Sequence, residues 1–306
     1  MRVFVTGASG FAGTHLCSHL RVLGHAVVTA ASGGVVDFPL DVCDAAAVRA
    51  ALGEARPEGV YHLAGLAYVP EAERNTDLVD AVNRGGTANV LDAAHDVGAR
   101  TLVVSSGAVY GRVAESELPV REESPLRPVG AYAESKAAAE AECARRVGRQ
   151  QIVVVRPFNH TGPGQAREYV CSDFAAQVAE CELALRRPVV DVGDLRSERD
   201  FTDVRDVVRA YVAALERGTS GATYNVCSGR ATSAAAILDT LRELARVDFR
   251  VRVRDERLRA GEVSRFCGDA GKIRAAAGWW PDIPLRTTLA NLLDDWRSRL
   301  AGPGRA

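Results

Sequence analysis

The chain has 306 residues, of which 47% are hydrophobic and 25% charged, and its formal net charge is −1. These values are typical of a globular protein with one large or two moderate domains, and no basic run forms the electrostatic footprint of a nucleic-acid-binding protein. No apolar run reaches the ~18 residues of a membrane span, and the start MRVFVTGASG lacks the apolar core of a signal peptide. Seven widely spaced cysteines without a C-x-x-C pair predict reduced thiols in a cytoplasmic protein, and no metal site is expected.

Apolar runs that end in turn residues alternate with helix-like segments over roughly the first half of the chain. The expected strands are 2–6, 25–31, 59–65, 101–108 and 151–157, and the expected helices are 12–24, 45–55, 84–98 and 132–146. Strands that are apolar on both faces and alternate with helices indicate a parallel sheet covered on both sides. The sequence therefore predicts a doubly wound (Rossmann) α/β fold.

This alternation weakens after Pro157. A helix at about 203–217 and a strand at 223–228 are expected to return to the sheet, whereas the remainder, with a final helix near 286–300, suggests a smaller substrate-binding α/β domain. The expected cofactor domain spans 1–157 and 199–229, and the expected substrate domain spans 158–198 and 230–306.

The segment TGASGFAG follows the first strand and opens the first helix. Its glycines Gly7, Gly10 and Gly13 have the spacing G-x-x-G-x-x-G, which allows a tight turn, close approach to a pyrophosphate and close helix–sheet packing. The helix N-terminus adds free N–H groups and a partial positive charge. A glycine loop alone is often only a structural turn, but in the first strand–turn–helix of an α/β chain it indicates a dinucleotide site, to which Phe11 is also assigned.

The end of the second strand indicates which dinucleotide binds. The stretch TAASGG carries no carboxylate that would bind the ribose hydroxyls and repel a 2′-phosphate. Ser32 is able to hydrogen-bond such a phosphate, although no arginine is adjacent, so the sequence favours NADPH and leaves NADH open. Asp41 and Val42 lie where an adenine edge would be held, although Asp41 also fits the N-cap of a helix.

Lysine is rare in this chain: among 38 basic residues only Lys136 and Lys272 are lysine. Tyr132 lies four residues before Lys136, so the two side chains share a face of a helix. A phenol titrates at about 10, and a neighbouring ammonium is expected to lower that pKa, which suits Tyr132 to general acid–base work on a carbonyl. Lysine would also reach the nicotinamide ribose, where the planar fork of arginine is a poor substitute. The alternative is an exposed Tyr and Lys on a surface helix, which is our interpretation of Lys272.

Two serines end the strand in the segment VVSSGAVYG. Ligands of parallel sheets bind beyond the carboxyl ends of the strands, so Ser105 and Ser106 are expected at the edge of the active site. A hydroxyl there polarises a substrate oxygen as charge develops on it. We select Ser106 for this role; a turn serine bonded to its own backbone is the alternative.

Together these motifs resemble the extended short-chain dehydrogenases that act on nucleotide sugars, and the resemblance covers nearly the whole chain. Further matching segments are HLAG (62–65), NRGGTANVL (83–91), RDFTDVRDVVRAY (199–211), YNVCSG (224–229) and GDAGKIRAAAGWWP (268–281). Within that superfamily, RPFNHTGPGQ (156–165) with VCSDFA (170–175) is most similar to the GDP-4-keto-6-deoxymannose reductases, which are relatives of the GDP-mannose 4,6-dehydratases.

The resemblance implies roles for the matching positions. Leu63 and Ala64 would border the cofactor, Phe158 would flank the nicotinamide, and Asn83 would support the helix that carries the Tyr–Lys pair. Arg199 and Arg259 would hold the substrate diphosphate, because the guanidinium fork binds phosphate well. Glu262 would hold the nucleotide ribose. His160 would approach the sugar or the diphosphate, or serve as a structural histidine. The implied substrate contacts are Ser106, Asn159, Val170, Arg199, Arg259 and Glu262.

One difference from the dehydratases indicates which reaction to expect. Dehydratases of this group carry Thr/Ser-x-Glu after the strand, and the glutamate moves a proton during water elimination. Here the stretch is Ser106-Gly107-Ala108, and alanine cannot take a proton. The expected reaction is therefore NAD(P)H-dependent reduction of the C4 ketone of an NDP-4-keto-6-deoxyhexose. A dTDP-sugar substrate, an epimerase with tightly bound NAD and a non-catalytic dinucleotide sensor are the alternatives. The family also implies a homodimer.

Overall fold

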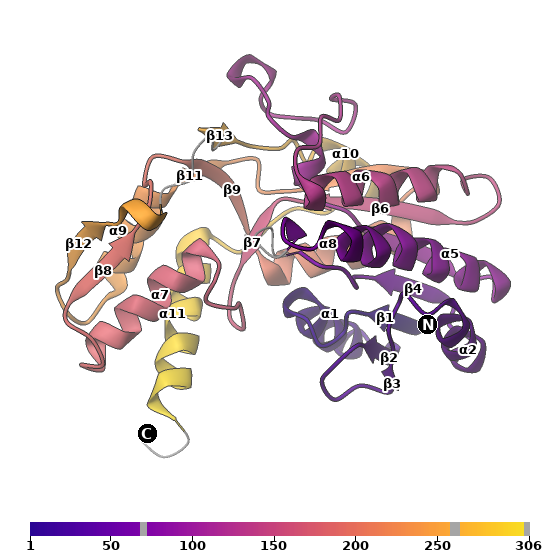
Figure 1. Ribbon diagram of the computed structural model, residues 1–306, viewed down its shortest axis with the longest axis horizontal. Helices are drawn as coiled ribbons and strands as arrows, with labels where there is room; N and C mark the ends of the chain where they lie inside the picture. The colour runs from indigo at the N-terminus through magenta and orange to yellow at the C-terminus, as the bar shows by residue number, and fades with distance from the viewer. Residues whose placement is uncertain (68–71, 258–263, 303–306) are drawn as a thin grey trace.

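The computed structural model describes residues 1–67, 72–257 and 264–302, and its centre is a seven-stranded parallel sheet (Figure 1). The strands are β1 (Arg2–Thr6), β2 (Ala26–Ala31), β3 (Phe38–Pro39), β4 (Gly59–His62), β5 (Arg100–Val104), β6 (Ile152–Pro157) and β10 (Thr223–Val226). Their order is β10-β6-β5-β4-β1-β2-β3. This order leaves β1 near the centre, and the chain winds from there toward both edges.

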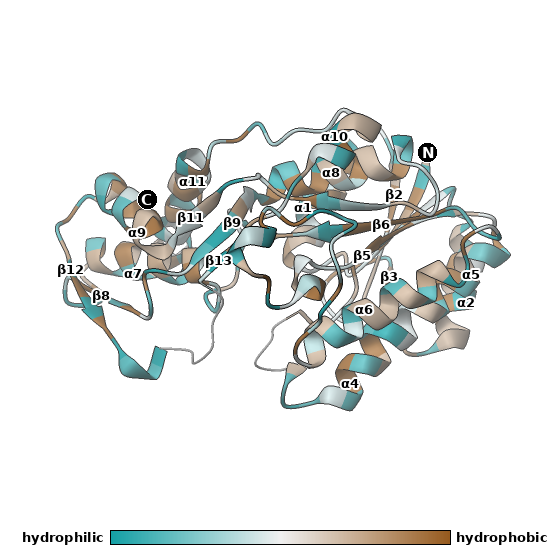
Figure 2. Ribbon diagram, turned by 90° about the horizontal axis from the view of Figure 1, so that it is seen from above, coloured by the Kyte–Doolittle hydropathy of each residue, from teal (hydrophilic) through white to brown (hydrophobic). Residues whose placement is uncertain are grey.

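Helices cover both faces of this sheet. One face carries α1 (Phe11–Val22), α8 (Val204–Arg217) and α10 (Gly271–Ala277), and the other carries α2 (Ala45–Ala55), α5 (Gly86–Asp96) and α6 (Ala131–Ala144). In Figure 2 the strands β5 and β6 are mostly brown because most of their residues are hydrophobic, and these residues are buried. The predicted doubly wound α/β fold is confirmed.

The helix expected at 84–98 begins earlier than predicted and is not regular. A short helix α4 (Thr76–Asp80), a π-helical segment η1 (Ala81–Gly85) and α5 follow one another directly. Asn83 lies in the π-helical segment with its side chain buried. Such π segments occur often at functional sites, because they present a side chain that a regular helix would direct elsewhere.

The other strands form two small sheets beside the large one. They are β7 (Asn159–Thr161), β8 (Val189–Val192), β9 (Glu198–Asp203), β11 (Ala231–Ser233), β12 (Arg250–Val253) and β13 (Arg265–Phe266). Strand β9 pairs with β7, β11 and β13, and β8 pairs in parallel with β12. Three helices pack around these sheets over a separate hydrophobic cluster: α7 (Val170–Glu182), α9 (Ala234–Leu244) and α11 (Leu285–Ala301).

Strand β9 corrects one predicted boundary. The segment 199–229 was expected to return to the large sheet as a whole, but β9 belongs to a small sheet, and the return begins with α8. The reason is that Asp203 ends β9 and caps α8, accepting a hydrogen bond from the Arg205 backbone N–H, so the chain changes layer at that residue. In the described part of the chain no helix combines the length and the hydropathy that a bilayer span requires.

Candidate active site

The glycine loop between β1 and α1 is a cradle that side chains would fill. Gly7 has a φ of 68°, and a Cβ there would lie 2.7 Å from the Ala64 backbone nitrogen and 2.9 Å from the Leu63 carbonyl carbon. A Cβ at Gly13 would overlap the Gly7 carbonyl oxygen, and Gly10 begins α1 without a capping side chain. The helix N–H groups therefore remain available to an anion, and the loop fits the pyrophosphate of a dinucleotide.

Phe11, the first residue of α1, stacks on His160. The ring centroids are 5.9 Å apart and the ring planes differ by 3°. The His160 Nδ1 lies 3.1 Å from the Phe158 carbonyl oxygen, and burial lowers the pKa of His160. These contacts favour the structural interpretation of His160, as a neutral ring that joins the phosphate loop to β7.

Ser32 is exposed directly after β2. The carboxylate of Asp37, in the turn that follows, bends back to β2 and accepts hydrogen bonds from the backbone N–H and the hydroxyl of Thr29, both at 2.8 Å. These hydrogen bonds hold the pKa of Asp37 below its usual range. Asp37 is thus engaged in the structure of the turn, while the Ser32 hydroxyl faces the solvent at the strand end.

Asp41 and Val42 differ in their surroundings. Asp41 is exposed and accepts a hydrogen bond from the Cys43 backbone N–H at 2.9 Å, whereas the N-cap of α2 is Asp44. The helix-cap interpretation of Asp41 is therefore wrong. Val42 is buried against Gly86 of α5, where a Cβ would lie 2.6 Å from the Val42 Cγ2. Of this pair, only Asp41 is exposed.

The three predicted catalytic residues meet at the carboxyl end of β5. The first turn of α6 places the Tyr132 phenol close enough to the Ser106 hydroxyl for Ser106 to lower its pKa, and Ser106 lies directly before the 3-10 turn η2 (Gly107–Tyr110), where its Oγ accepts a hydrogen bond from the Ala108 backbone N–H at 3.1 Å. Lys136, one turn later, is buried and donates from Nζ to the Val104 carbonyl oxygen at 2.9 Å. Helical spacing thus brings the Tyr–Lys pair to the strand end that carries the serine.

The pKa values in this cluster run against one expectation. Burial raises the pKa of Tyr132, and the hydrogen bond with Ser106 offsets that rise only in part. Burial lowers the pKa of Lys136 to about 8, although the Glu140 carboxylate acts in the opposite direction. The expected net lowering of the Tyr132 pKa is therefore wrong, because desolvation of the phenol outweighs the interaction with Ser106. Tyr132 is protonated at neutral pH, which is the form that donates a proton.

Asn83 connects α6 to the loop after β4. Its Oδ1 accepts a hydrogen bond from the Leu66 backbone N–H at 2.9 Å, and its Nδ2 donates to the Ser135 Oγ at 2.9 Å. Ser135 in turn donates to the Tyr132 carbonyl oxygen at 2.8 Å. These contacts agree with the supporting role that the resemblance implies for Asn83.

Phe158 is a core residue. Only 4% of it is exposed, and its ring stacks on Phe266 with centroids 5.0 Å apart. Gly107 and Gly268 lie against the ring, so that a Cβ at Gly268 would be 2.5 Å from the Phe158 Cζ. That the Phe158 side chain flanks a nicotinamide stays a prediction.

The predicted substrate contacts lie on the small sheets and on α7. Asn159 is exposed on β7, Val170 is exposed at the start of α7, and Arg199 is half-buried on β9, where it donates to the Glu198 carbonyl oxygen at 2.9 Å. Strands β7 and β9 are neighbours, so Asn159 and Arg199 belong to the same sheet. Arg259 and Glu262 lie outside the described residues.

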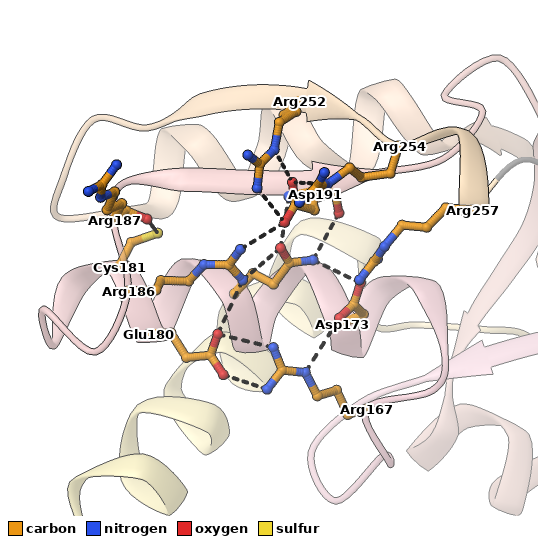
Figure 3. Close-up of polar contacts among 11 residues, drawn as sticks. Arg167, Asp173, Glu180, Cys181, Arg186, Arg187, Asp191, Arg252, Arg254 and Arg257 are labelled. Atoms are coloured by element: carbon orange, nitrogen blue, oxygen red, sulfur yellow. Dashed lines mark hydrogen bonds and ion pairs between the residues drawn. The ribbon is translucent and has the colours of Figure 1, made fainter.

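An ion-pair network fixes the start of α7 (Figure 3). Asp173 pairs with Arg257, and Glu180 pairs with Arg167. Hydrogen bonds from Arg252, with burial opposing, lower the pKa of Asp191 in β8 to about 2. The arginines bound to Asp191 are Arg186, Arg252 and Arg254. The network ties α7, β8 and β12 into one rigid support.

Two parts of the site escaped the sequence analysis. Tyr169 lies close enough to Tyr132 that the electrostatic interaction between the two phenols raises the pKa of Tyr132. The sequence could have indicated Tyr169, because it directly precedes Val170, a predicted substrate contact. Glu140, four residues after Lys136, forms a buried pair with Arg156. No group of three His, Cys, Asp or Glu side chains in 1–67, 72–257 and 264–302 is arranged to hold a metal ion.

The glycine cradle, the Ser–Tyr–Lys cluster and the doubly wound sheet define a dinucleotide-dependent protein, and the chain belongs to the NAD dependent epimerase/dehydratase family, whose model matches residues 3–227. It is 38% identical to the GDP-6-deoxy-D-mannose reductase of Pseudomonas aeruginosa over 306 residues, which covers 98% of each chain. It is 27% identical to the GDP-6-deoxy-D-talose 4-dehydrogenase of Aggregatibacter actinomycetemcomitans, again over 98% of each chain. The solved structure of RMD from Pseudomonas aeruginosa complexed with NADPH matches with a TM-score of 0.90 and 37% identity, over 97% of this chain and 99% of that one.

Proposed function

We propose that this protein uses NADPH to reduce the C4 ketone of a GDP-4-keto-6-deoxyhexose. The observation that carries the proposal is the proximity of Tyr132 to Ser106, one helical turn before the buried Lys136, at the carboxyl end of a strand in the sheet whose first turn forms the glycine cradle. Two full-length relatives, a GDP-6-deoxy-D-mannose reductase and a GDP-6-deoxy-D-talose 4-dehydrogenase, support a GDP-sugar and the C4 position.

The residues of the chain divide the chemistry among them. A bound reduced nicotinamide supplies the hydride. Tyr132, neutral at physiological pH, donates a proton to the ketone oxygen, and the Ser106 hydroxyl holds that oxygen by a hydrogen bond. As the phenol loses its proton, negative charge develops on Tyr132, and the ammonium of Lys136 stabilises it. Ala108, which has no carboxylate to move a second proton, argues against water elimination and for simple ketone reduction.

The nucleotide and the reaction are tested together by following the absorbance of reduced nicotinamide. The purified protein receives NADPH or NADH with GDP-4-keto-6-deoxymannose, and in parallel with dTDP-4-keto-6-deoxyglucose. Stoichiometric loss of NADPH with the GDP-sugar supports the proposal. Loss with the dTDP-sugar alone would show that the substrate carries dTDP and not GDP. Conversion of a sugar by a protein that holds NAD, without net loss of the reduced cofactor, would indicate an epimerase.

The preference for NADPH is supported by Ser32 and by the NADPH complex of the similar structure. We expect Ser32→Asp to weaken NADPH binding by about tenfold or more relative to NADH, because the new carboxylate repels the 2′-phosphate and binds the ribose hydroxyls. Fluorescence titration with both cofactors measures the ratio of dissociation constants. Ser298→Asp, at an exposed position of α11, is the matched control and should leave the ratio unchanged.

We also propose a division of labour between two parts of the chain, supported by the separate hydrophobic cluster around Phe174, Ile237 and Leu289. The part built on the large sheet binds the cofactor, and residues 158–203 and 230–302 bind the nucleotide sugar. Each of the seven cysteines is free and six are buried, which supports a reducing compartment, the cytoplasm.

A homodimer is the proposed assembly. Helices α5 and α6 lie side by side on one face of the sheet, and the outer face of α6 presents small side chains, among them Ala141 and Ala144, to the solvent. Small residues allow close approach of a second copy. Light scattering coupled to size-exclusion chromatography should report twice the mass of 32.6 kDa, and a value equal to the chain mass would reject this assembly.

A further inference from the structure

The two serines at the end of β5 point to different partners. Ser106 meets the phenol of Tyr132, whereas the Ser105 hydroxyl donates to the Glu140 Oε1 at 2.5 Å. Ser105 is buried, and the Glu140 side chain retains only 10% exposure. The reaction proposed above uses the first serine and leaves the second, with its buried carboxylate, unexplained.

Arg156 locks this carboxylate in place. Its Nε donates to the Glu140 Oε1 at 2.9 Å and its Nη2 donates to Oε2 at 2.6 Å, a bidentate geometry that is both strong and directional. The guanidinium also lies over the Tyr110 ring, 4.9 Å from the centroid, and donates to the Tyr110 hydroxyl at 2.9 Å. A buried carboxylate held in this way has little freedom to rotate, so the position of Ser105 is fixed through it.

Glu140 also shares a helix face with Lys136, four residues earlier. Lys136 binds the Val104 carbonyl oxygen and Glu140 binds Ser105, so α6 holds two consecutive residues of the strand end. The next residue is Ser106. The attachment of α6 to β5 therefore determines where the Ser106 hydroxyl lies relative to Tyr132, which is itself on α6.

We propose that Glu140, held by Arg156, is a positioning residue of the active site: through Ser105 it aligns Ser106 with Tyr132, and it sets the electrostatic surroundings of the Lys136 ammonium, with which it shares a face of α6. The expected effect of Glu140 on kcat rests on the proposed ketone reduction. The expected effect of Glu140 on Lys136 does not depend on that reaction. Glu140 does not touch the substrate and is not a catalytic residue.

The charges around Lys136 decide in which direction Glu140 changes the pKa of Lys136. On α6 Lys136 interacts with Glu140 and Cys143, and on β4 with His62, a buried ring whose pKa is lowered to about 3 by burial and by Lys136. Burial lowers the pKa of Lys136 and Glu140 opposes that change. Neutralising Glu140 therefore shifts the deprotonation of Lys136 to lower pH.

The first experiment is kinetic. Ser105→Ala removes the link to Glu140 and retains every charge. We expect kcat to fall on the order of tenfold to a hundredfold, with KM and NADPH affinity changed little and the pH profile unshifted, because only the alignment of Ser106 is lost. Thr288→Val in α11, which deletes another buried hydroxyl, is the matched control and should retain the wild-type kcat.

The second experiment needs no substrate. Because the chain has only two lysines, lysine labelled with carbon-13 at Cε gives two resonances, and Lys272→Arg assigns them. We expect the Lys136 resonance to titrate with a midpoint near pH 8 in the wild type, at a lower pH in Glu140→Gln, and at the wild-type midpoint in Ser105→Ala. The alkaline limb of kcat should move to lower pH in Glu140→Gln alone.

Two results would overturn the proposal. One is a Ser105→Ala protein that folds, binds NADPH and turns over at the wild-type rate. The other is an unchanged Lys136 midpoint in a folded Glu140→Gln protein. Since Glu140→Gln leaves Arg156 buried beside a neutral amide, Ser105→Ala provides the decisive kinetic result if that variant does not fold. A wild-type protein without reductase activity, but with the expected lysine titration, would reject the proposed function and leave the charge role of Glu140 supported.

Discussion

Tyr132→Phe is expected to abolish most turnover while NADPH still binds. The phenylalanine ring retains the packing of the first turn of α6 but has no proton to donate and no hydrogen bond with Ser106. Loss of a positioned general acid lowers kcat by roughly a hundredfold to ten-thousandfold. The measurement is kcat for NADPH oxidation, together with the NADPH dissociation constant from fluorescence titration.

Tyr61→Phe is the matched control for this change. Tyr61 is fully buried in β4, and its hydroxyl has no hydrogen-bond partner among the described residues, so its removal should leave both kcat and cofactor affinity unchanged. If Tyr132→Phe turned over at the wild-type rate, Tyr132 would not be the acid. If NADPH binding were lost together with turnover, the phenol would have to be assigned to cofactor binding instead.

Gly13→Ala is expected to remove cofactor binding and to destabilise the fold. The new methyl group would overlap the Gly7 carbonyl oxygen and lie 2.9 Å from the Ala8 Cα, so α1 must move away from the glycine loop. Inserting a methyl group into a packed contact costs about 1–3 kcal/mol, and more where the neighbouring atoms belong to the backbone. The helix N–H groups that would meet the pyrophosphate move with α1.

Gly53→Ala tests the same substitution without the close contact. Gly53 is a helical glycine in α2, and a Cβ there would meet nothing within 4 Å. Alanine should increase the free energy of unfolding by up to about 1 kcal/mol, because glycine is the poorer helix former. Urea unfolding and NADPH titration of both variants provide the comparison. Equal NADPH affinities in the Gly13→Ala and wild-type proteins would contradict the assignment of the loop to the cofactor.

The large sheet was predictable because its signals are local. Each of its longer strands is an apolar run that ends in a turn residue, and the predicted helix at 45–55 agrees with α2 (Ala45–Ala55). The small sheets were not predicted, since strands such as β7 and β13 contain three or two residues and have no periodicity to detect. Their pairing depends on β9, which lies in the segment 199–229 that the sequence analysis assigned to the cofactor domain.

The site shows the same distinction between local and distant signals. The glycine loop and the Tyr132–Lys136 pair each consist of residues that are close in the sequence. The structure places the members of each motif as their spacing predicts. The burial of Phe158 depends on Gly268, which is more than a hundred residues away. The use of Ser105 depends on Glu140 and a buried arginine from another strand, so neighbouring sequence alone did not indicate it.

The central claim is that this site transfers hydride to the C4 carbon of a GDP-linked sugar. The most direct test is to incubate the protein with GDP-4-keto-6-deoxymannose and NADPH that carries deuterium on the transferable side of nicotinamide C4, and to examine the product by NMR and mass spectrometry. We predict one deuterium per product molecule, at sugar C4, with one NADPH oxidised for each ketone reduced. A product without deuterium, or deuterium at another carbon, would contradict the account.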